Sequence, residues 1–464
     1  MNVPENSGYL DQAKELHQAD NLEEAEVAYK KAIMKKPENA EALALLGVLC
    51  CQSGRLEEGI QYLRKATTYN PKSAETYYNL AKALSNVGLL EDAVTAYKAS
   101  LRIRDDYVDA WNNLGDCFSQ LGRVAESVQA YEKALKLDPN QFVYFNLGNA
   151  LLETEDLDSA VECYKQAFDI DPGFSEATLN LTTALKRQGY LADAKAWCEL
   201  TLEMRPDYVK ALNELASLFH QMRETEKATQ TYKRALELEP NNPIANHWLN
   251  SLAGKSAPKA DPAYVEELFD QYALRFDDHL TQQLQYKVPS VLFDMVKENE
   301  SEKFRFSSVL DIGCGTGLCG SLFRPHCEKL YGVDISSKMI QEARKKKVYD
   351  DLSDQEIFAY LGITVINFDL ILSADVFVYF GYLEPVFQGI TKVSKEDTCF
   401  AFSTETYSGR EFGLKPSGRF GHSREYVEVT ANKFGWNLDS VQSDTIRVEN
   451  GQPVPGDLYL FRLK

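Results

Sequence analysis

Small and bulky apolar residues recur at fixed distances along the first half of the chain. In each unit an aliphatic residue precedes a small one, as at Leu114 and Gly115, and an aromatic residue such as Tyr131 comes later. The aromatic stands four residues after one small residue and three before another, which is the spacing of a single helix face. Because small residues let neighbouring helices approach closely, the pattern predicts pairs of packed helices.

The units have a period of 34 residues, and prolines near their ends mark it. Successive prolines are separated by 34, 68, 33, 34 and 34 residues, at Pro37, Pro71, Pro139, Pro172, Pro206 and Pro240. The pattern closely resembles the tetratricopeptide repeat, with seven units over residues 6–242 and a capping helix over 243–253. The resemblance implies an all-α superhelical solenoid whose groove binds a protein or peptide.

One asparagine recurs before the aliphatic residue of four consecutive units, at Asn79, Asn113, Asn146 and Asn180. The spacing is similar to the asparagine ladder of O-linked N-acetylglucosamine transferase, whose amides hold an extended peptide backbone. An amide is both donor and acceptor, which suits such binding. The four residues are therefore predicted to line a peptide-binding groove, unless asparagine is simply common at this position of the repeat.

The repeat pattern ends at a stretch rich in proline and small residues, which predicts a linker over 254–263. Helical spacing returns over 264–298, and short apolar runs then alternate with helical segments. Three of these runs, residues 308–312, 329–334 and 368–375, predict buried strands, and 438–446 with 457–462 predict a closing antiparallel hairpin. This order predicts an α/β domain over residues 264–464.

The first of these strands leads into a glycine-rich turn. The turn contains Gly313, Gly315 and Gly317 directly after Asp311, and glycines let a backbone approach a ligand closely. The second strand ends at Asp334, where a carboxylate can accept hydrogen bonds from both ribose hydroxyls of an adenosine. A dinucleotide dehydrogenase is the alternative, but its pattern is Gly-x-Gly-x-x-Gly and Asp311 would be unusual there.

Together these motifs resemble the class I, seven-stranded S-adenosylmethionine-dependent methyltransferases, which have a Rossmann-like fold. The resemblance implies S-adenosylmethionine as cofactor, with Asp311 and the three glycines around its methionine end and Asp334 on its ribose. Asp354 is the candidate for the adenine, and an exposed helix-capping role is its alternative. Asp375, at the end of a strand, is a further candidate for cofactor binding.

Methyl transfer from a sulfonium needs little more than alignment and a base for the acceptor. The candidates for that base are Asp375, Tyr379, Glu405 and His422. Residues 264–280 and Tyr286 resemble the corresponding segment of predicted methyltransferases that contain tetratricopeptide repeats. In these, aromatic residues such as Tyr272 and Phe276, together with His279, cover the cofactor pocket; plain helix packing is the alternative.

Charge and composition narrow the partners. The 464 residues include 69 acidic and 50 basic ones, for a formal net charge of -19, which disfavours nucleic acid. No apolar run approaches the ~20 residues of a membrane helix, and the N-terminus has no signal-like pattern. The nine cysteines are scattered and without metal-ligand spacing. We therefore expect a cytoplasmic protein without membrane insertion and without a bound metal.

The segment after the third strand, Asp375-Val376-Phe377-Val378, lacks the Asn/Asp-Pro-Pro-aromatic tetrapeptide of enzymes that methylate amide or adenine nitrogens. No Pro-Cys dipeptide occurs, which argues against methylation of cytosine through a cysteine adduct. The leading hypothesis is a methyltransferase whose repeats recruit a protein substrate or partner. The alternatives are a small-molecule methyltransferase docked to an assembly by its repeats, and an inactive scaffold.

Overall fold

A computed structural model describes residues 8–464 except 255–257, 274–275, 279, 282–283, 301–303 and 450. The chain forms two compact units, Met1–Pro206 and Asp207–Lys464, and each is described by itself. The described residues of the segment predicted as a linker, 254 and 258–263, all lie in the second unit, and residues 255–257 lie outside the described part. The prediction for His279 also falls outside the described residues.

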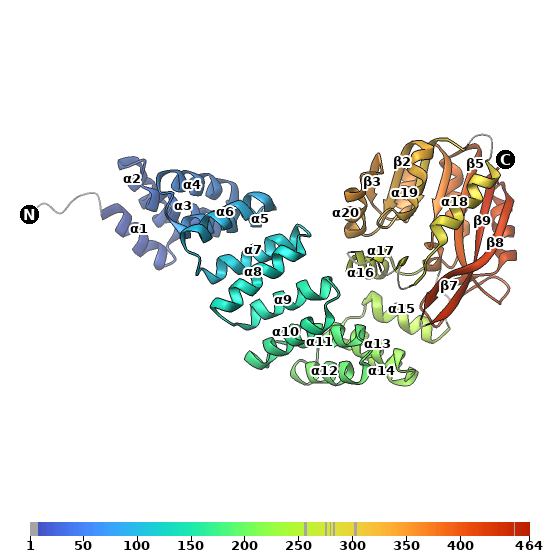
Figure 1. Ribbon diagram of the computed structural model, residues 1–464, viewed down its shortest axis with the longest axis horizontal. Helices are drawn as coiled ribbons and strands as arrows, with labels where there is room; N and C mark the ends of the chain where they lie inside the picture. Colours follow the sequence, from blue (N-terminus) through green and yellow to red (C-terminus); the bar gives the residue numbers. More distant parts are fainter. Residues whose placement is uncertain are drawn as a thin grey trace, which may run out of the picture. The chain divides into compact units, whose positions relative to one another are not determined.

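The first unit consists of six antiparallel helix pairs (Figure 1). The helices are α1 (Gly8–Gln18), α2 (Leu22–Lys35), α3 (Ala40–Gln52), α4 (Leu56–Tyr69), α5 (Ala74–Asn86), α6 (Leu90–Ile103), α7 (Val108–Gln120), α8 (Val124–Leu137), α9 (Gln141–Glu153), α10 (Leu157–Ile170), α11 (Ser175–Arg187) and α12 (Leu191–Met204). Several begin with a side-chain cap; Asn39, Ser73 and Asn140 each accept a backbone N–H of the first turn.

The spacing that recurs in each unit has a direct packing cause. A Cβ added at Gly115 would lie 2.5 Å from the ring of Tyr131, and one at Gly148 would lie 2.7 Å from that of Tyr164. The glycine of the first helix therefore makes room for the aromatic ring of the second. The predicted repeat solenoid is confirmed for these helix pairs.

The second unit begins with a seventh helix pair, α13 (Val209–Gln221) and α14 (Thr225–Leu238), and a single helix α15 (Pro243–Leu252). Helices α16 (Pro262–Tyr272), α17 (Phe276–Asp278) and α18 (Val288–Asn299) precede the first strand. Asn242 caps α15 by accepting the N–H of Ala245, and Asp261 caps α16 in the same way through Ala263. Proline at the first turn of α15 and α16 fits the start of a helix.

A nine-stranded sheet forms the centre of the second unit. Its strands are β1 (Phe306–Ile312), β2 (Cys327–Asp334), β3 (Asp351–Asp354), β4 (Phe368–Ser373), β5 (Ser394–Thr406), β6 (Phe412–Leu414), β7 (Phe420–His422), β8 (Trp436–Glu449) and β9 (Gln452–Leu463). Strands β3-β2-β1-β4-β5 run parallel in that order. Strand β9 pairs antiparallel with β5 and then with β8, which confirms the predicted hairpin.

Helices cover both faces of this sheet, because strand residues alternate between two apolar clusters. Leu310 and Ile312 of β1 belong to one cluster, and Val309 belongs to the other with Leu292 and Val296 of α18. The remaining helices are α19 (Leu318–Phe323), α20 (Ser337–Lys346), α21 (Ile357–Ile363), α22 (Glu384–Lys392) and α23 (Arg424–Lys433). The Rossmann-like prediction is confirmed, and the parallel strands place their carboxyl ends at one edge of the sheet.

The described residues contain no helix that is long and apolar enough to cross a membrane. Within the same part of the chain, no three His, Cys, Asp or Glu side chains are grouped as metal ligands.

Candidate active site

The glycine turn after β1 has a backbone conformation that requires glycine. Gly313, Gly315 and Gly317 have φ angles of 64°, 53° and 91°, in the left-handed region. The amides of Gly313 and Cys314 both donate to the carbonyl of Val333 on β2, at 2.8 and 3.0 Å. The turn is thereby fixed to the neighbouring strand, with its backbone toward the carboxyl edge of the sheet.

Asp334 ends β2 and holds the same turn. Its Oδ2 accepts a hydrogen bond from the amide of Gly315 at 2.8 Å, and its Oδ1 accepts one from the amide of Ser336 at 2.9 Å. Burial raises the pKa of this carboxyl to about 6. Ile335 donates a further backbone hydrogen bond, so about one of the roughly four acceptor sites of this carboxylate remains for a ligand.

Asp311 is placed differently from the other predicted cofactor residues. It is 1% exposed and accepts a hydrogen bond from the hydroxyl of Tyr349 at 2.7 Å, while burial raises its pKa to about 7. The ring of Tyr349 also packs on Gly317 and Gly320; a Cβ at Gly320 would lie 2.3 Å from its hydroxyl oxygen. Asp311 and Gly317 therefore contact Tyr349, a residue that no sequence pattern had indicated.

A cavity of about 890 Å³ lies at the carboxyl edge of the sheet. Gly313, Gly315 and Asp334 line one part of it, and Asp375 and Tyr379 line another. Its volume is near the upper end of the range for ligand pockets, roughly 300–1,000 Å³. Asp354 does not line it and is exposed at the end of β3, whereas the nearby Glu356 and Ile357 do. The role of Asp354 at the adenine therefore stays a prediction.

Aromatic side chains from the helices before β1 form one side of this cavity. Phe269, Tyr272, Phe276 and Tyr286 all line it, and a Cβ at Gly315 would lie 3.4 Å from the ring of Phe276. These rings pack edge to face, with centroids 6.1 Å apart for Phe269 and Phe276 and 5.2 Å apart for Tyr272 and Phe276. The aromatic residues thus both line the cavity and pack on one another, and their role as a cover for the cofactor stays a prediction.

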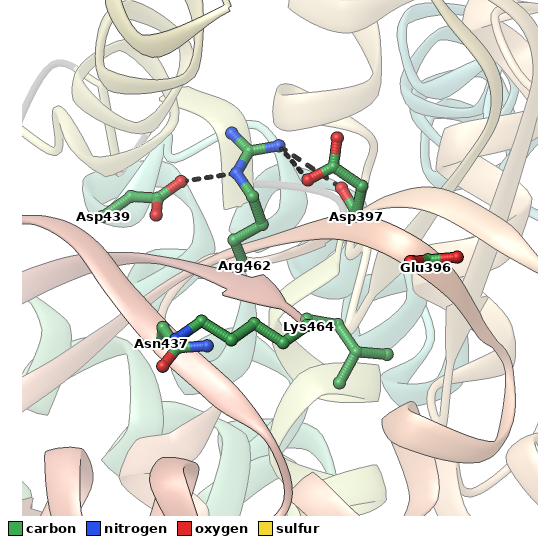
Figure 2. A pocket seen from close by; sticks show the side chains of 7 residues that line it. Glu396, Asp397, Asn437, Asp439, Arg462 and Lys464 are labelled. Carbon is green, nitrogen blue, oxygen red and sulfur yellow. Dashed lines mark hydrogen bonds and ion pairs between the residues drawn. The ribbon is translucent and has the colours of Figure 1, made fainter.

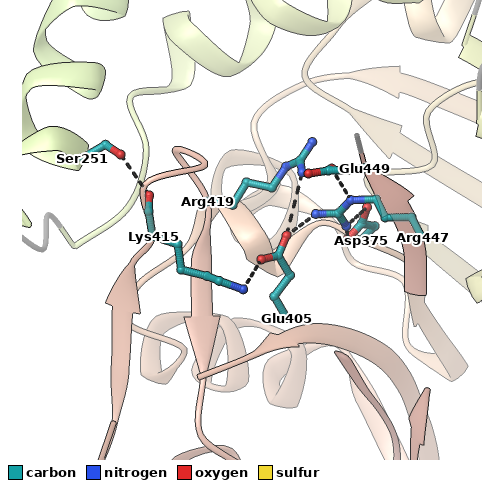
Figure 3. A network of polar contacts seen from close by, with 7 residues as sticks. All are labelled: Ser251, Asp375, Glu405, Lys415, Arg419, Arg447 and Glu449. Atoms are coloured by element: carbon teal, nitrogen blue, oxygen red, sulfur yellow. Dashed lines mark hydrogen bonds and ion pairs between the residues drawn. The ribbon is translucent and has the colours of Figure 1, made fainter. Parts of the chain in front are cut away.

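A network of ion pairs surrounds Arg447 next to Asp375 (Figure 3). Arg447 is 1% exposed; its Nη1 donates to both oxygens of Asp375 at 2.8 Å, its Nη2 donates to Glu405, and its Nε donates to Glu449 at 2.6 Å. Arg419 also pairs with Glu449. Charge-assisted hydrogen bonds of this kind fix the position of each group. Arg419 and Arg447 were not found by sequence reasoning, since neither lies in a motif.

This network bears on two of the predicted bases. Asp375 is bound by Arg447, and Glu405 is buried between Arg447 and Lys415, whose Nζ lies 2.7 Å from it. Asp375 has a φ of 61°, a conformation that the surrounding contacts must hold in place. The structure therefore shows both carboxylates as anchors for cations, and their role as bases stays a prediction.

The two other predicted bases differ in their access to the cavity. Tyr379 lines it, and burial raises the pKa of its hydroxyl. His422 is fully buried on β7 and does not line the cavity; its Nε2 donates to the carbonyl of Gly381 at 3.1 Å. Burial lowers the pKa of His422 to about 4, so the ring is neutral at physiological pH.

A smaller surface pocket of about 590 Å³ lies elsewhere on the second unit (Figure 2). It is lined by Glu396 and Asp397 near the start of β5, whereas Glu405 lies near the end of that strand. Two cationic residues line it, Arg462 and Lys464, and Arg462 is already paired with Asp439, Glu300 and Asp397. This pocket is therefore separate from the glycine turn and from Asp334.

In the first unit, the predicted asparagines occupy the same position, the sixth residue, of α5, α7, α9 and α11. The amide of Asn146 donates to Asn112 at 3.1 Å and to Asp116 at 3.3 Å, and that of Asn180 donates to Asn149 at 2.8 Å. Asn113 donates to the hydroxyl of Tyr78. These side chains connect neighbouring repeats, and their contact with a peptide stays a prediction.

Comparison with protein-family models identifies both parts of the chain. A methyltransferase domain model matches residues 310–400, and tetratricopeptide repeat models match residues 16–84, 74–107, 108–141, 142–174 and 209–242. The matched residues include the last three residues of β1, the glycine turn, Asp334 and Asp375. They also include α13 and α14, the helix pair that belongs to the second compact unit.

Curated relatives are similar over parts of the chain. RNA polymerase II-associated protein 3 of Homo sapiens is 30% identical over 26% of this chain and 18% of its own length. The STIP1 homolog of Dictyostelium discoideum is 25% identical over 37% of this chain and 32% of its own length. A probable S-adenosylmethionine-dependent methyltransferase of Saccharomyces cerevisiae is 28% identical over 32% of this chain and 57% of its own length. The chain thus spans less than two thirds of each.

Among solved structures, YrrB, described as a tetratricopeptide repeat protein with an unusual peptide-binding site, is 24% identical. It covers 40% of this chain and 96% of its own, with a TM-score of 0.36. A repeat protein from Cytophaga hutchinsonii is 19% identical and covers 51% of this chain and 98% of its own, with a TM-score of 0.46.

Proposed function

Because this chain joins tetratricopeptide repeats to a methyltransferase domain, we propose that it transfers the methyl group of S-adenosylmethionine to a protein recruited by the repeats. The observation that carries the proposal is the cavity in which Asp334 and the glycine turn lie together. S-adenosylmethionine, when bound, supplies a methyl group already activated on a sulfonium.

The residues around the cavity fit that cofactor. The carboxylate of Asp334 accepts backbone hydrogen bonds from Gly315, Ser336 and Ile335, which leaves about one of its roughly four acceptor sites for a ribose hydroxyl. Gly313 and Gly315 expose backbone without side chains, and a Cβ at Gly313 would lie 2.3 Å from Val376. Phe269 and Phe276 supply apolar surface for the adenosine and exclude water.

The remaining work of the chain is to position the acceptor. Arg447, Arg419 and Lys415 balance the charges of Asp375, Glu405 and Glu449. The network therefore offers fixed dipoles and hydrogen bonds without a net charge to repel a ligand. Two of the predicted bases, Asp375 and Tyr379, line the cavity. Asp375 is held in an ion pair, whereas Tyr379 is not. We therefore propose that Tyr379 contacts the acceptor.

Two measurements test this function. Calorimetry should detect binding of S-adenosylhomocysteine to the full chain, with a large loss of affinity in Asp334→Ala. Tritiated S-adenosylmethionine should label a protein in an extract of the source cells, and Asp334→Ala should abolish the label. Absence of binding would support an inactive scaffold, and label confined to small molecules would support the alternative acceptor class.

A further inference from the structure

The last repeat supplies part of the wall of the cavity. Ser217, His220 and Gln221 of α13 and Trp248 of α15 line it together with the glycine turn and Arg419. The rings of His220 and Trp248 are 4.9 Å apart, so the two helices present one continuous surface. All of these residues belong to the second compact unit.

The register of the repeats identifies which helix face this is. Ser217 is the ninth residue of α13, as Asp116 is of α7 and Asn149 is of α9. Asp116 and Asn149 accept the hydrogen bonds from Asn146 and Asn180 that connect neighbouring repeats. The helix face that carries the asparagines in earlier repeats therefore faces the cavity in the last one.

The same repeat end also holds a loop of the catalytic domain. The Nε2 of His247 donates to the carbonyl of Gly418 at 2.8 Å, and the hydroxyl of Ser251 donates to the carbonyl of Lys415 at 2.9 Å. The side chain of Lys415 reaches Glu405 in the network around Arg447 (Figure 3). His247 also stacks on Tyr264, with ring centroids 4.1 Å apart. Helix α15 thus positions the loop that carries Arg419.

Resting on the proposed methyltransferase function, we infer that the surface formed by Ser217, His220, Gln221 and Trp248 binds the acceptor as a polypeptide segment. The amide of Gln221 and the hydroxyl of Ser217 are donors and acceptors suited to a peptide backbone. The rings of His220 and Trp248 offer an apolar surface for a neighbouring side chain. Gln221 is exposed at the wall, so the surface continues from the cavity to solvent and leaves room for flanking residues.

The inference is tested on the full chain with Gln221→Ala and Trp248→Ala. Lys210→Ala is the matched control, because Lys210 is exposed on α13 and does not line the cavity. Transfer from tritiated S-adenosylmethionine into protein of the source extract should fall at least about tenfold in Trp248→Ala and severalfold in Gln221→Ala. Binding of S-adenosylhomocysteine should stay within about twofold in all variants, and Trp248→Phe should restore transfer, since a ring is kept.

Each other outcome overturns the inference. Equal labelling of protein by the wild type, Gln221→Ala and Trp248→Ala would show that the acceptor does not bind at this surface. A parallel loss of S-adenosylhomocysteine binding would assign the surface to the cofactor instead. A chain that binds S-adenosylhomocysteine but labels no protein would overturn the inference while leaving the cofactor site intact, whereas absence of that binding in the wild type refutes the proposed function itself.

Discussion

Replacement of Asp334 by Asn tests the cofactor site most directly. The substitution keeps the size of the side chain but removes its charge and one of its two acceptor oxygens. A hydrogen bond to a charged group contributes about 1.5–3 kcal/mol, which corresponds to a roughly 10- to 150-fold weaker affinity for S-adenosylhomocysteine. We expect a loss in this range, measured by calorimetry at pH 7.5.

The pH dependence of binding provides a second, independent readout. The pKa of Asp334 is raised from 3.8 to about 6, so the carboxylate gains a proton as pH falls through 6. Affinity of the wild type should then fall as pH drops below 6 and level off near the roughly 10- to 150-fold loss expected for Asp334→Asn. Burial raises the pKa of Asp311 to about 7, so Asp311 also contributes to this pH dependence. The pH dependence of binding that remains in Asp334→Asn measures the contribution of Asp311.

The same shift predicts the effect on stability. Because the pKa of Asp334 is higher in the folded chain than its usual value, its contribution to folding is present below about 3.8 and is lost as pH rises through 6. At neutral pH, Asp334→Asn should therefore lower the free energy of unfolding by no more than the loss of one backbone hydrogen bond to this side chain. Asp351→Asn, on the exposed start of β3, is the matched control.

Two results would refute this reasoning about Asp334. One is an affinity of Asp334→Asn within about threefold of the wild type at pH 7.5. The other is an identical slope for variant and wild type below pH 6. Asp354→Asn, measured in the same series, decides whether Asp354 contacts the adenine.

Three further predictions concern stability and the base. Arg447→Met should destabilise the second unit by about 3–5 kcal/mol at pH 7.5 and lower Tm by roughly 6–20 °C, because Asp375 loses its ion pair with Arg447 and Glu405 and Glu449 keep only Lys415 and Arg419. Loss of the exposed Arg424–Glu428 pair in Arg424→Met should cost under about 1 kcal/mol. A chain of residues 254–464 should melt about 4–12 °C below one of 207–464, because it lacks the two hydrogen bonds and the ring stacking of α15; equal melting temperatures in calorimetry would contradict this. Label transfer by His422→Asn should keep its pH profile between 6 and 9, because the pKa of His422 is about 4; a loss of 100-fold or more would instead identify it as the base.

The parts of the fold that were predictable are those in which contacts are local or repeated. A period of 34 residues with glycine opposite tyrosine, as in Gly115 and Tyr131, specifies a helix pair, because the contact lies within one unit. The glycine turn and Asp334 were equally accessible to sequence reasoning, because parallel neighbouring strands end at the same edge of a sheet.

The residues that sequence reasoning missed make their contacts between elements far apart in the chain. Arg447 reaches Asp375 across 72 positions, and Tyr349 reaches Asp311 across 38. The sequence makes His422 a candidate base, but only its burial on β7 shows that its pKa is lowered to about 4. Burial and pairing are properties of the packed structure, so no local pattern contains them.

The sequence by itself thus determined the two fold types and the glycine turn followed by Asp334, because periodicity and turn chemistry are encoded in neighbouring residues. The tertiary structure decided which predicted acids are paired with cations, and it placed α13 and α15 beside the glycine turn. That placement depends on the packing of His247 and Ser251 against the loop that contains Gly418. Contacts between residues so far apart in the sequence contribute to stability only after both surfaces have folded, so they depend on the tertiary structure as a whole.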